Sequence, residues 1–263
     1  MFQPSIPFDG LIGWRVLQRT YDTQFEAFSS SSQIKRDTDY FRENIGSVET
    51  AADLVADRRL LSVALGAFGL QDDINNKFFI QKILEEGTVN DDALANRFAD
   101  SRYKEFSAQF GFGPTELQKT KLSTFPDEIV GLYERQSFEV AVGEQSQTLR
   151  VALAAERSFT DLADSTASEK TKWFEVMGQP PLRSLFETVF NLPTSFAQVD
   201  IDKQQEVFAK RSAEMFGTSD PSQFSDPELQ EELLTRYTAM SQLKNSSNLT
   251  SSGSAALTLL RGF

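Results

Sequence analysis

Apolar residues recur at spacings of three and four along most of this chain, the period that places side chains on one face of an α-helix. Near the N-terminus the period is carried by Trp14, Leu17, Tyr21, Phe25 and Phe28. Strict alternation of apolar and polar residues, which would indicate β-strands, is scarce. The sequence therefore predicts an all-α fold.

The aromatic helix predicted within residues 1–34 has two interpretations. An apolar stripe of this kind most often packs on the core of its own domain. It can instead dock onto a partner chain, because amphipathic helices also bind in grooves of other proteins. On the second interpretation the candidate partner-binding residues are Trp14, Leu17, Tyr21, Phe25 and Phe28.

Helix boundaries are marked at both ends. Gly69, Gly87, Asn191 and Gly217 each follow an apolar helical pattern, and glycine or asparagine adopts the left-handed conformation that ends a helix. Helix starts are predicted where a Ser or Thr precedes a Glu or Gln by three positions, an arrangement in which each side chain can bond the other's backbone N–H. The pairs with this spacing are Thr115 with Gln118, Thr166 with Glu169, and Ser225 with Glu228.

Two parts of the sequence resemble each other. Residues 60–70, LLSVALGAFGL, align with residues 182–192, LRSLFETVFNL, and each copy follows an aromatic pair and precedes a further helical segment. This order predicts two related helical lobes, 35–110 and 165–240. We expect the central helices of residues 111–164 to join them, with Gly143 bending or dividing a long helix.

The last residues, 241–263, differ from the rest of the chain. Residues 241–254 are rich in Ser and Asn, which predicts a flexible segment. An apolar terminus follows it, and an apolar end on a flexible tether either folds back or binds another protein. The candidate partner-binding residues here are Leu257, Leu259, Leu260 and Phe263.

Histidine and cysteine are both absent. This excludes Ser-His-Asp and Cys-His catalysis, zinc sites built from His or Cys, and disulfides. We assign no catalytic residue, metal ligand or cofactor. The paired carboxylates Asp200 with Asp202, and Asp72 with Asp73, lack the ligand spacing of a calcium loop and favour helix capping. The enzymatic alternative is a hydrolase that uses carboxylates and a hard metal between the lobes, and a small-molecule binding module in that cleft is a further one.

The formal charge of −12 repels a phosphate backbone and disfavours nucleic acid as a partner. No apolar run approaches the roughly 20 residues needed to span a bilayer, and the N-terminus lacks the pattern of a Sec signal peptide. We therefore expect no integral membrane segment. Cysteine-free chains occur in the cytoplasm and also among proteins exported through specialised channels.

Several segments carry a resemblance to a known family. They are GLIGWRVLQRT at 10–20, YFRENI at 40–45, SFEVAVGEQSQTLRVAL at 137–153, KWFEVMGQPPLRSLFETVFNLP at 172–193 and VDIDKQQ at 199–205. Together they resemble DUF1217, a family of unknown function found mainly in alphaproteobacteria, whose members tend to be encoded among flagellar genes. The resemblance implies a non-enzymatic structural or assembly protein that binds a flagellar or other protein partner. It places the chain in the cytoplasm or in the flagellar apparatus, where export by the flagellar route would deliver it.

Overall fold

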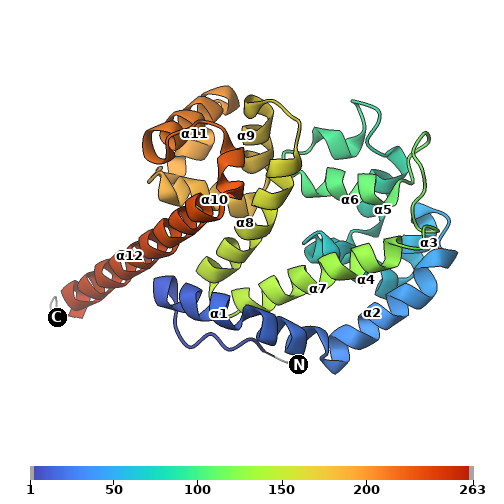
Figure 1. Cartoon of the computed structure of the whole chain (residues 1–263), viewed down its shortest axis with the longest axis horizontal. Helices are drawn as coiled ribbons and strands as arrows, with labels where there is room; N and C mark the ends of the chain where they lie inside the picture. Colours follow the sequence, from blue (N-terminus) through green and yellow to red (C-terminus); the bar gives the residue numbers. More distant parts are fainter. Residues whose placement is uncertain (1–2, 261–263) are drawn as a thin grey trace. The chain divides into compact units, whose positions relative to one another are not determined.

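The computed structural model describes residues 3–260, apart from the side chains of Asp161, Asp164 and residues 246–260 (Figure 1). Every regular element within these residues is helical, which confirms the all-α fold. The chain divides into two compact units. Unit 1 contains the residues up to Ser5 and Thr20–Val142; unit 2 contains Ile6–Arg19 and the chain from Gly143 onward.

The boundary between the units differs in detail from the predicted lobes. The segment 35–110 lies wholly in unit 1 and the segment 165–240 wholly in unit 2. The predicted central helices are divided, since α7 (Phe125–Gly143) belongs almost entirely to unit 1 and α8 (Gln147–Asp164) to unit 2. The N-terminal helix α1 (Gly10–Ser29) is divided as well.

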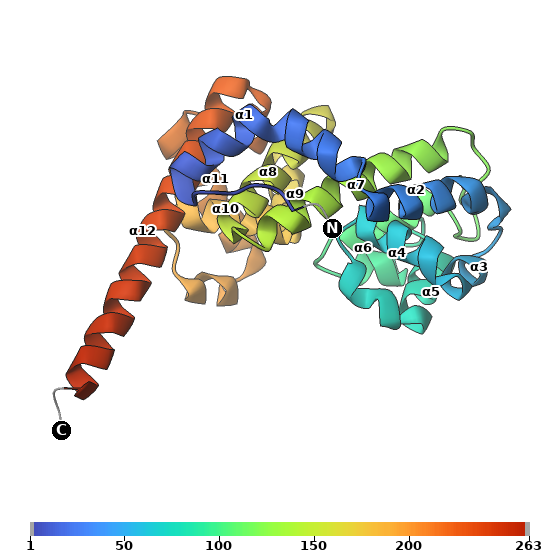
Figure 2. The same cartoon turned by 90° about the horizontal axis from the view of Figure 1, so that it is seen from below.

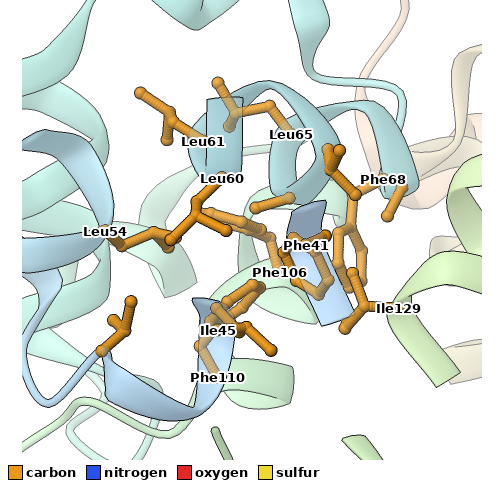
Figure 3. Close-up of a cluster of buried hydrophobic side chains, with 14 of the residues drawn as sticks. Phe41, Ile45, Leu54, Leu60, Leu61, Leu65, Phe68, Phe106, Phe110 and Ile129 are labelled. Carbon is orange, nitrogen blue, oxygen red and sulfur yellow. The ribbon is translucent and has the colours of Figure 1, made fainter. Parts of the chain in front are cut away.

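Unit 1 is built around a cluster of buried aromatic and aliphatic side chains (Figure 3). Phe41, Phe106 and Phe110 are fully buried there, and the rings of Phe110 and Phe125 meet edge to face with centroids 5.2 Å apart. The other regular elements are α2 (Ser32–Asn44), η1 (Ile45–Ser47), α3 (Ala51–Ala56), α4 (Arg58–Ala67), η2 (Gln71–Asn75), α5 (Lys77–Glu86), η3 (Leu94–Arg97) and α6 (Arg102–Phe110).

Unit 2 has a separate aromatic core. The Trp173 ring meets Phe186 with centroids 5.2 Å apart, and Phe224 packs on the same phenylalanine at 5.4 Å. After α8 the elements are α9 (Glu169–Gly178), α10 (Pro180–Val189), η4 (Thr194–Gln198), α11 (Ile201–Phe216), η5 (Pro221–Ser225) and α12 (Pro227–Leu260). Helix α12 continues past the other helices of unit 2 (Figure 2).

The predicted helix ends are confirmed. Gly69, Gly87, Asn191 and Gly217 all have positive φ, and Asn191 is the one described non-glycine residue that does. The ends of α4 and α10 are closed by the same hydrogen bonds. Leu70 N–H donates to the carbonyl five residues back at 2.9 Å, and the N–H of the residue after Asn191 does the same at 2.8 Å. The aligned segments thus end alike in local structure.

The predicted helix starts are less accurate. No helix begins near Thr115, where the chain is irregular from Gly111 to the start of α7. The cap of α9 is Ser168, two residues after Thr166, and Asp226 caps α12 in place of Ser225. Asp and Ser side chains accept the first N–H groups of a helix equally well. Where two such residues lie close together, the sequence therefore does not show which of them is the N-cap.

Other boundary predictions hold. Gly143 ends α7, and α8 begins four residues later behind a Ser146 cap that accepts the N–H of Leu149. Asp200 caps α11, as expected from its place before Asp202. The tail differs from expectation, because α12 is helical through Leu260 where a flexible segment is predicted from residue 241. Ser and Asn have only moderately low helix propensity, so a Ser- and Asn-rich sequence does not by itself end a helix.

Candidate binding groove

The N-terminal aromatic stripe is mostly interior. Trp14, Leu17 and Phe28 are at most 2% exposed, which corrects the hypothesis that these three residues form a docking surface. Tyr21 and Phe25 are half-buried, and both rings pack edge to face on Phe138 at 5.4 and 5.6 Å. Helical spacing identifies an apolar face but cannot tell whether the same chain covers it.

The C-terminal candidates Leu257, Leu259, Leu260 and Phe263 lie outside the residues whose side chains are described. Their proposed role in binding a partner stays a prediction.

A groove of about 650 Å³ lies in unit 1, where the end of α5 meets the turn that follows it and the irregular segment before α7. The lining includes four carboxylates and no lysine or arginine. Its residues are Glu85, Glu86, Val89, Asn90, Asp92, Ala93, Gly113, Pro114, Thr115 and Glu116.

Two of the carboxylates hold the walls together. Glu116 accepts the backbone N–H of Thr88 at 2.6 Å and its hydroxyl at 2.7 Å, and it also accepts the N–H of Gly113 at 3.3 Å. Glu86 accepts the N–H of Leu94 at 2.6 Å. Charged acceptors make strong bonds to backbone N–H groups, so these contacts fix the turn and the facing segment in place.

Two glycines allow the segments on the two sides of the groove to meet closely. Gly87 has φ of +68°, and a Cβ atom there would lie 2.8 Å from the Cα of Gly113. A Cβ on Gly113 would in turn approach the Cα of Gly87 to 2.8 Å. The two backbones therefore approach more closely than any side chain would allow.

The mouth of the groove combines charge with apolar surface. Glu85 and Asp92 are exposed, and the Asp92 carboxylate makes no ion pair with any described residue. Val89 is 68% exposed, and Leu117, which directly follows the lining segment, is 74% exposed. Such a surface suits a ligand that carries both positive charge and methylene groups.

The sequence did not identify this groove. The two segments that line the groove are joined by Glu116, which accepts hydrogen bonds from Thr88 across 28 positions. A hydrogen bond between residues so far apart in the chain leaves no periodic or local pattern in the sequence. The local signal at this site is the pair Gly113 and Pro114, which is typical of a turn.

Comparison with known proteins identifies the family of this chain. The family model described as "Protein of unknown function (DUF1217)" matches residues 67–249. The chain belongs to the DUF1217 family. A crystal structure of a protein from Agrobacterium tumefaciens, determined by a structural genomics consortium, is similar with a TM-score of 0.73 and 28% identity, over 92% of this chain and 99% of that one. A search of curated proteins found no match.

No group of three or more Asp, Glu, His or Cys residues able to hold a metal occurs in the described part of this DUF1217 chain. The carboxylates whose pKa is raised lie elsewhere: burial raises the pKa of Glu134 in α7 and of Glu156 in α8. Burial and a hydrogen bond to Asp73 raise the pKa of Tyr103 to about 12. Among the described helices, none is long and apolar enough to cross a membrane.

Proposed function

We propose that this DUF1217 protein is a non-enzymatic structural or assembly protein of the bacterial flagellum that works by binding another protein. The observation that carries the proposal is the groove of unit 1, where carboxylates and exposed apolar side chains occur together. Protein ligands offer basic and apolar groups side by side, which suits such a surface.

The groove's charge supports a protein partner over a nucleic acid. Four of the ten lining residues are Asp or Glu, and the chain carries a formal charge of −12. Both charges repel phosphate groups, and electrostatic attraction to phosphates supplies most of the non-specific affinity for nucleic acids.

The flagellar part of the proposal rests on the family resemblance, since DUF1217 members tend to be encoded among flagellar genes. The partner is then a rod, hook, export or motor component. The protein acts in the cytoplasm or in the flagellar apparatus, and export by the flagellar route would bring it to the second location.

Affinity capture tests this proposal. The full chain is immobilised and exposed to extracts of cells that are assembling flagella, beside an unrelated helical protein of similar negative charge. We expect flagellar proteins to be enriched on the full chain alone, and deletion of the gene to reduce motility. Background proteins only, together with normal motility in the deletion strain, would overturn the proposal.

A further inference from the structure

Helix α12 extends beyond the other helices of unit 2. Ser241 is the last buried residue among those whose side chains are described, and the helical backbone continues from there to Leu260 (Figure 2). We name residues 243–260 the α12 extension. At the rise of an α-helix this segment is roughly 27 Å long. It is therefore long enough to form a contact of its own with another molecule.

Apolar side chains are exposed where the α12 extension begins. Leu243 is 67% exposed. The start of α1 lies beside it, because a Cβ atom on Gly10 would come within 2.5 Å of the Gln242 side chain. On either side of that glycine, Phe8 is 55% exposed and Ile12 is 62% exposed. Exposed apolar side chains that lie near one another are common at contacts between proteins, so the base of the extension is a candidate interface.

The sequence of the α12 extension is symmetric about its middle along one helical face. Steps of four and three residues, which stay on one side of a helix, lead from Leu243 through Ser247, Thr250 and Ser254 to Leu257. The two leucines lie seven residues before and after Thr250, and the residues between them on this face are small. Two-fold symmetric dimers need a surface that is complementary to itself. This face meets that requirement when a second copy runs in the opposite direction.

The composition of the α12 extension also favours a second copy. Residues 245–260 contain no charged side chain, although the chain has a formal charge of −12, so like copies meet no local repulsion here. Ten of these sixteen residues are Ser, Thr, Asn or Gly, which have lower helix propensity than Ala or Leu. Helices in proteins gain most of their stability from packing on one face. A second helix along this face supplies that packing.

We propose that the α12 extension pairs with the same segment of a second copy of this chain, in antiparallel orientation and centred on Thr250. In this register position 243 of one copy lies opposite position 257 of the other. The apolar end of each helix then reaches the base of the other extension, where Phe8 and Ile12 are exposed. The inference goes beyond the proposed function, because the partner is the chain itself and the groove of unit 1 takes no part.

The size of this contact predicts a weak dimer. A single helical face roughly 27 Å long is smaller than a standard interface, which buries about 800 Å² on each partner. Interfaces below the standard size are typical of transient association. We therefore expect monomer and dimer to exchange in solution, with a dissociation constant in the micromolar range.

Sedimentation equilibrium of the full chain over a series of concentrations measures this association. Leu243→Lys and Leu257→Glu are made singly and together. In the antiparallel register each single change places a charge opposite a leucine, whereas the double variant places each lysine opposite a glutamate. The control variant carries Asn245→Lys and Ser252→Glu, which add the same two charges on the opposite side of the helix by its spacing.

We expect each single variant to dimerise about tenfold more weakly than the natural chain, the double variant to regain most of that loss, and the control to stay within about twofold. A natural chain that is monomeric at every concentration would overturn the inference. A double variant as weak as the single variants would overturn it too. The same holds if a mixture of Leu243→Lys and Leu243→Glu chains recovers instead, because that result places position 243 opposite itself, as in a parallel pair.

The absence of cysteine allows a second measurement of the register. Thr250→Cys places one thiol of each copy at the proposed two-fold axis, where two Cα atoms within about 7 Å can be joined by a disulfide. Under mild oxidation we expect Thr250→Cys to form covalent dimers by itself. We expect Leu243→Cys to do so only when it is mixed with Leu257→Cys. Dimers of Leu243→Cys alone that form as fast as those in the mixture would overturn the antiparallel pairing.

Discussion

The turn after α5 (residues 87–93, the unit 1 turn) and the turn after α11 (residues 217–223, the unit 2 turn) share two hydrogen bonds and differ in what surrounds them. In unit 2 the chain fills its own turn, with the Lys172 ammonium on Ser222 and the Trp173 indole N–H donating to the Ser219 carbonyl at 2.7 Å. In unit 1 the corresponding residues line an open groove. The difference teaches that two turns with the same hydrogen bonds can have different surroundings, and that the surrounding side chains decide whether the chain fills the turn itself.

The largest effect on stability is expected from Trp173, whose indole N–H bonds the unit 2 turn. Trp173→Ala should lower the free energy of unfolding by about 3–5 kcal/mol, because the ring is fully buried. Trp173→Phe should cost less, although it leaves the Ser219 carbonyl without its donor. Trp14 is the matched control, since it is equally buried but its indole N–H has no hydrogen-bond partner.

Trp14→Phe should therefore cost less than Trp173→Phe, by about 1 kcal/mol. Urea unfolding of the three variants measures the difference. If both Trp→Phe variants lose the same stability, the bond to Ser219 does not hold the unit 2 turn and the contrast between the turns is weakened.

Replacing the glycine that starts each turn should lower stability by different amounts. Gly217→Ala introduces a side chain at positive φ with nothing within 4 Å, so only backbone strain of about 1 kcal/mol opposes it. Gly87→Ala adds the clash with Gly113 and should cost about 2–3 kcal/mol in total. Thermal unfolding compares them. Equal losses would mean that the backbones at Gly87 and Gly113 move apart easily.

Lys172 should contribute less to the free energy of unfolding than the Trp173 ring. Lys172→Ala removes the charge beside Asp220 and should cost about 1–2 kcal/mol, since Asp220 is partly solvated. Lys172→Met keeps most of the stem and removes only the ammonium. We expect its stability to lie between that of the natural chain and Lys172→Ala in urea unfolding. A methionine variant as stable as the natural chain would show that the ammonium contributes nothing to the turn.

Much of the fold is predictable from local sequence. Gly69 and Asn191 mark helix ends because the conformation they need is rare in other residues, and Asp200 marks a helix start because its side chain bonds the next N–H groups. These signals act over a few residues. The pair Thr115 with Gln118 shows their limit, because Glu116 between them bonds Thr88 instead of a helix turn.

The groove and the fate of the aromatic stripe are not predictable in this way. Whether Trp14 faces its own core or a partner depends on segments far away in sequence. The same holds for the groove, whose two sides lie together where Gly87 and Gly113 approach each other across 26 positions. Contacts of this kind depend on how distant segments pack together, and local patterns in a single sequence do not specify that packing.

The smallest effect on stability is expected from Glu156, which lies in neither turn. Burial, with a contribution from the charge of Glu231, raises the pKa of Glu156 above its ordinary value. The native state then binds more protons than the unfolded state between the two pKa values, so stability falls as pH rises through that interval. Glu156→Gln should therefore be more stable than the natural chain at neutral pH, and the gain should vanish near pH 4.

Unfolding measured from pH 4 to 8 checks this, with Glu206→Gln as the control substitution at an exposed position. A Glu156→Gln gain that persists unchanged at low pH would contradict it, since the effect would then come from packing and not from charge.

The central claim is that the ammonium of Lys172 fills the unit 2 turn, and chemical rescue tests it most directly. Lys172→Ala empties the unit 2 turn, and n-propylammonium has the three carbons and the ammonium that are removed. We predict that added n-propylammonium raises the melting temperature of Lys172→Ala in a saturable way, while n-propanol and the natural chain show no such rise. Equal shifts for the variant and the natural chain would contradict the claim.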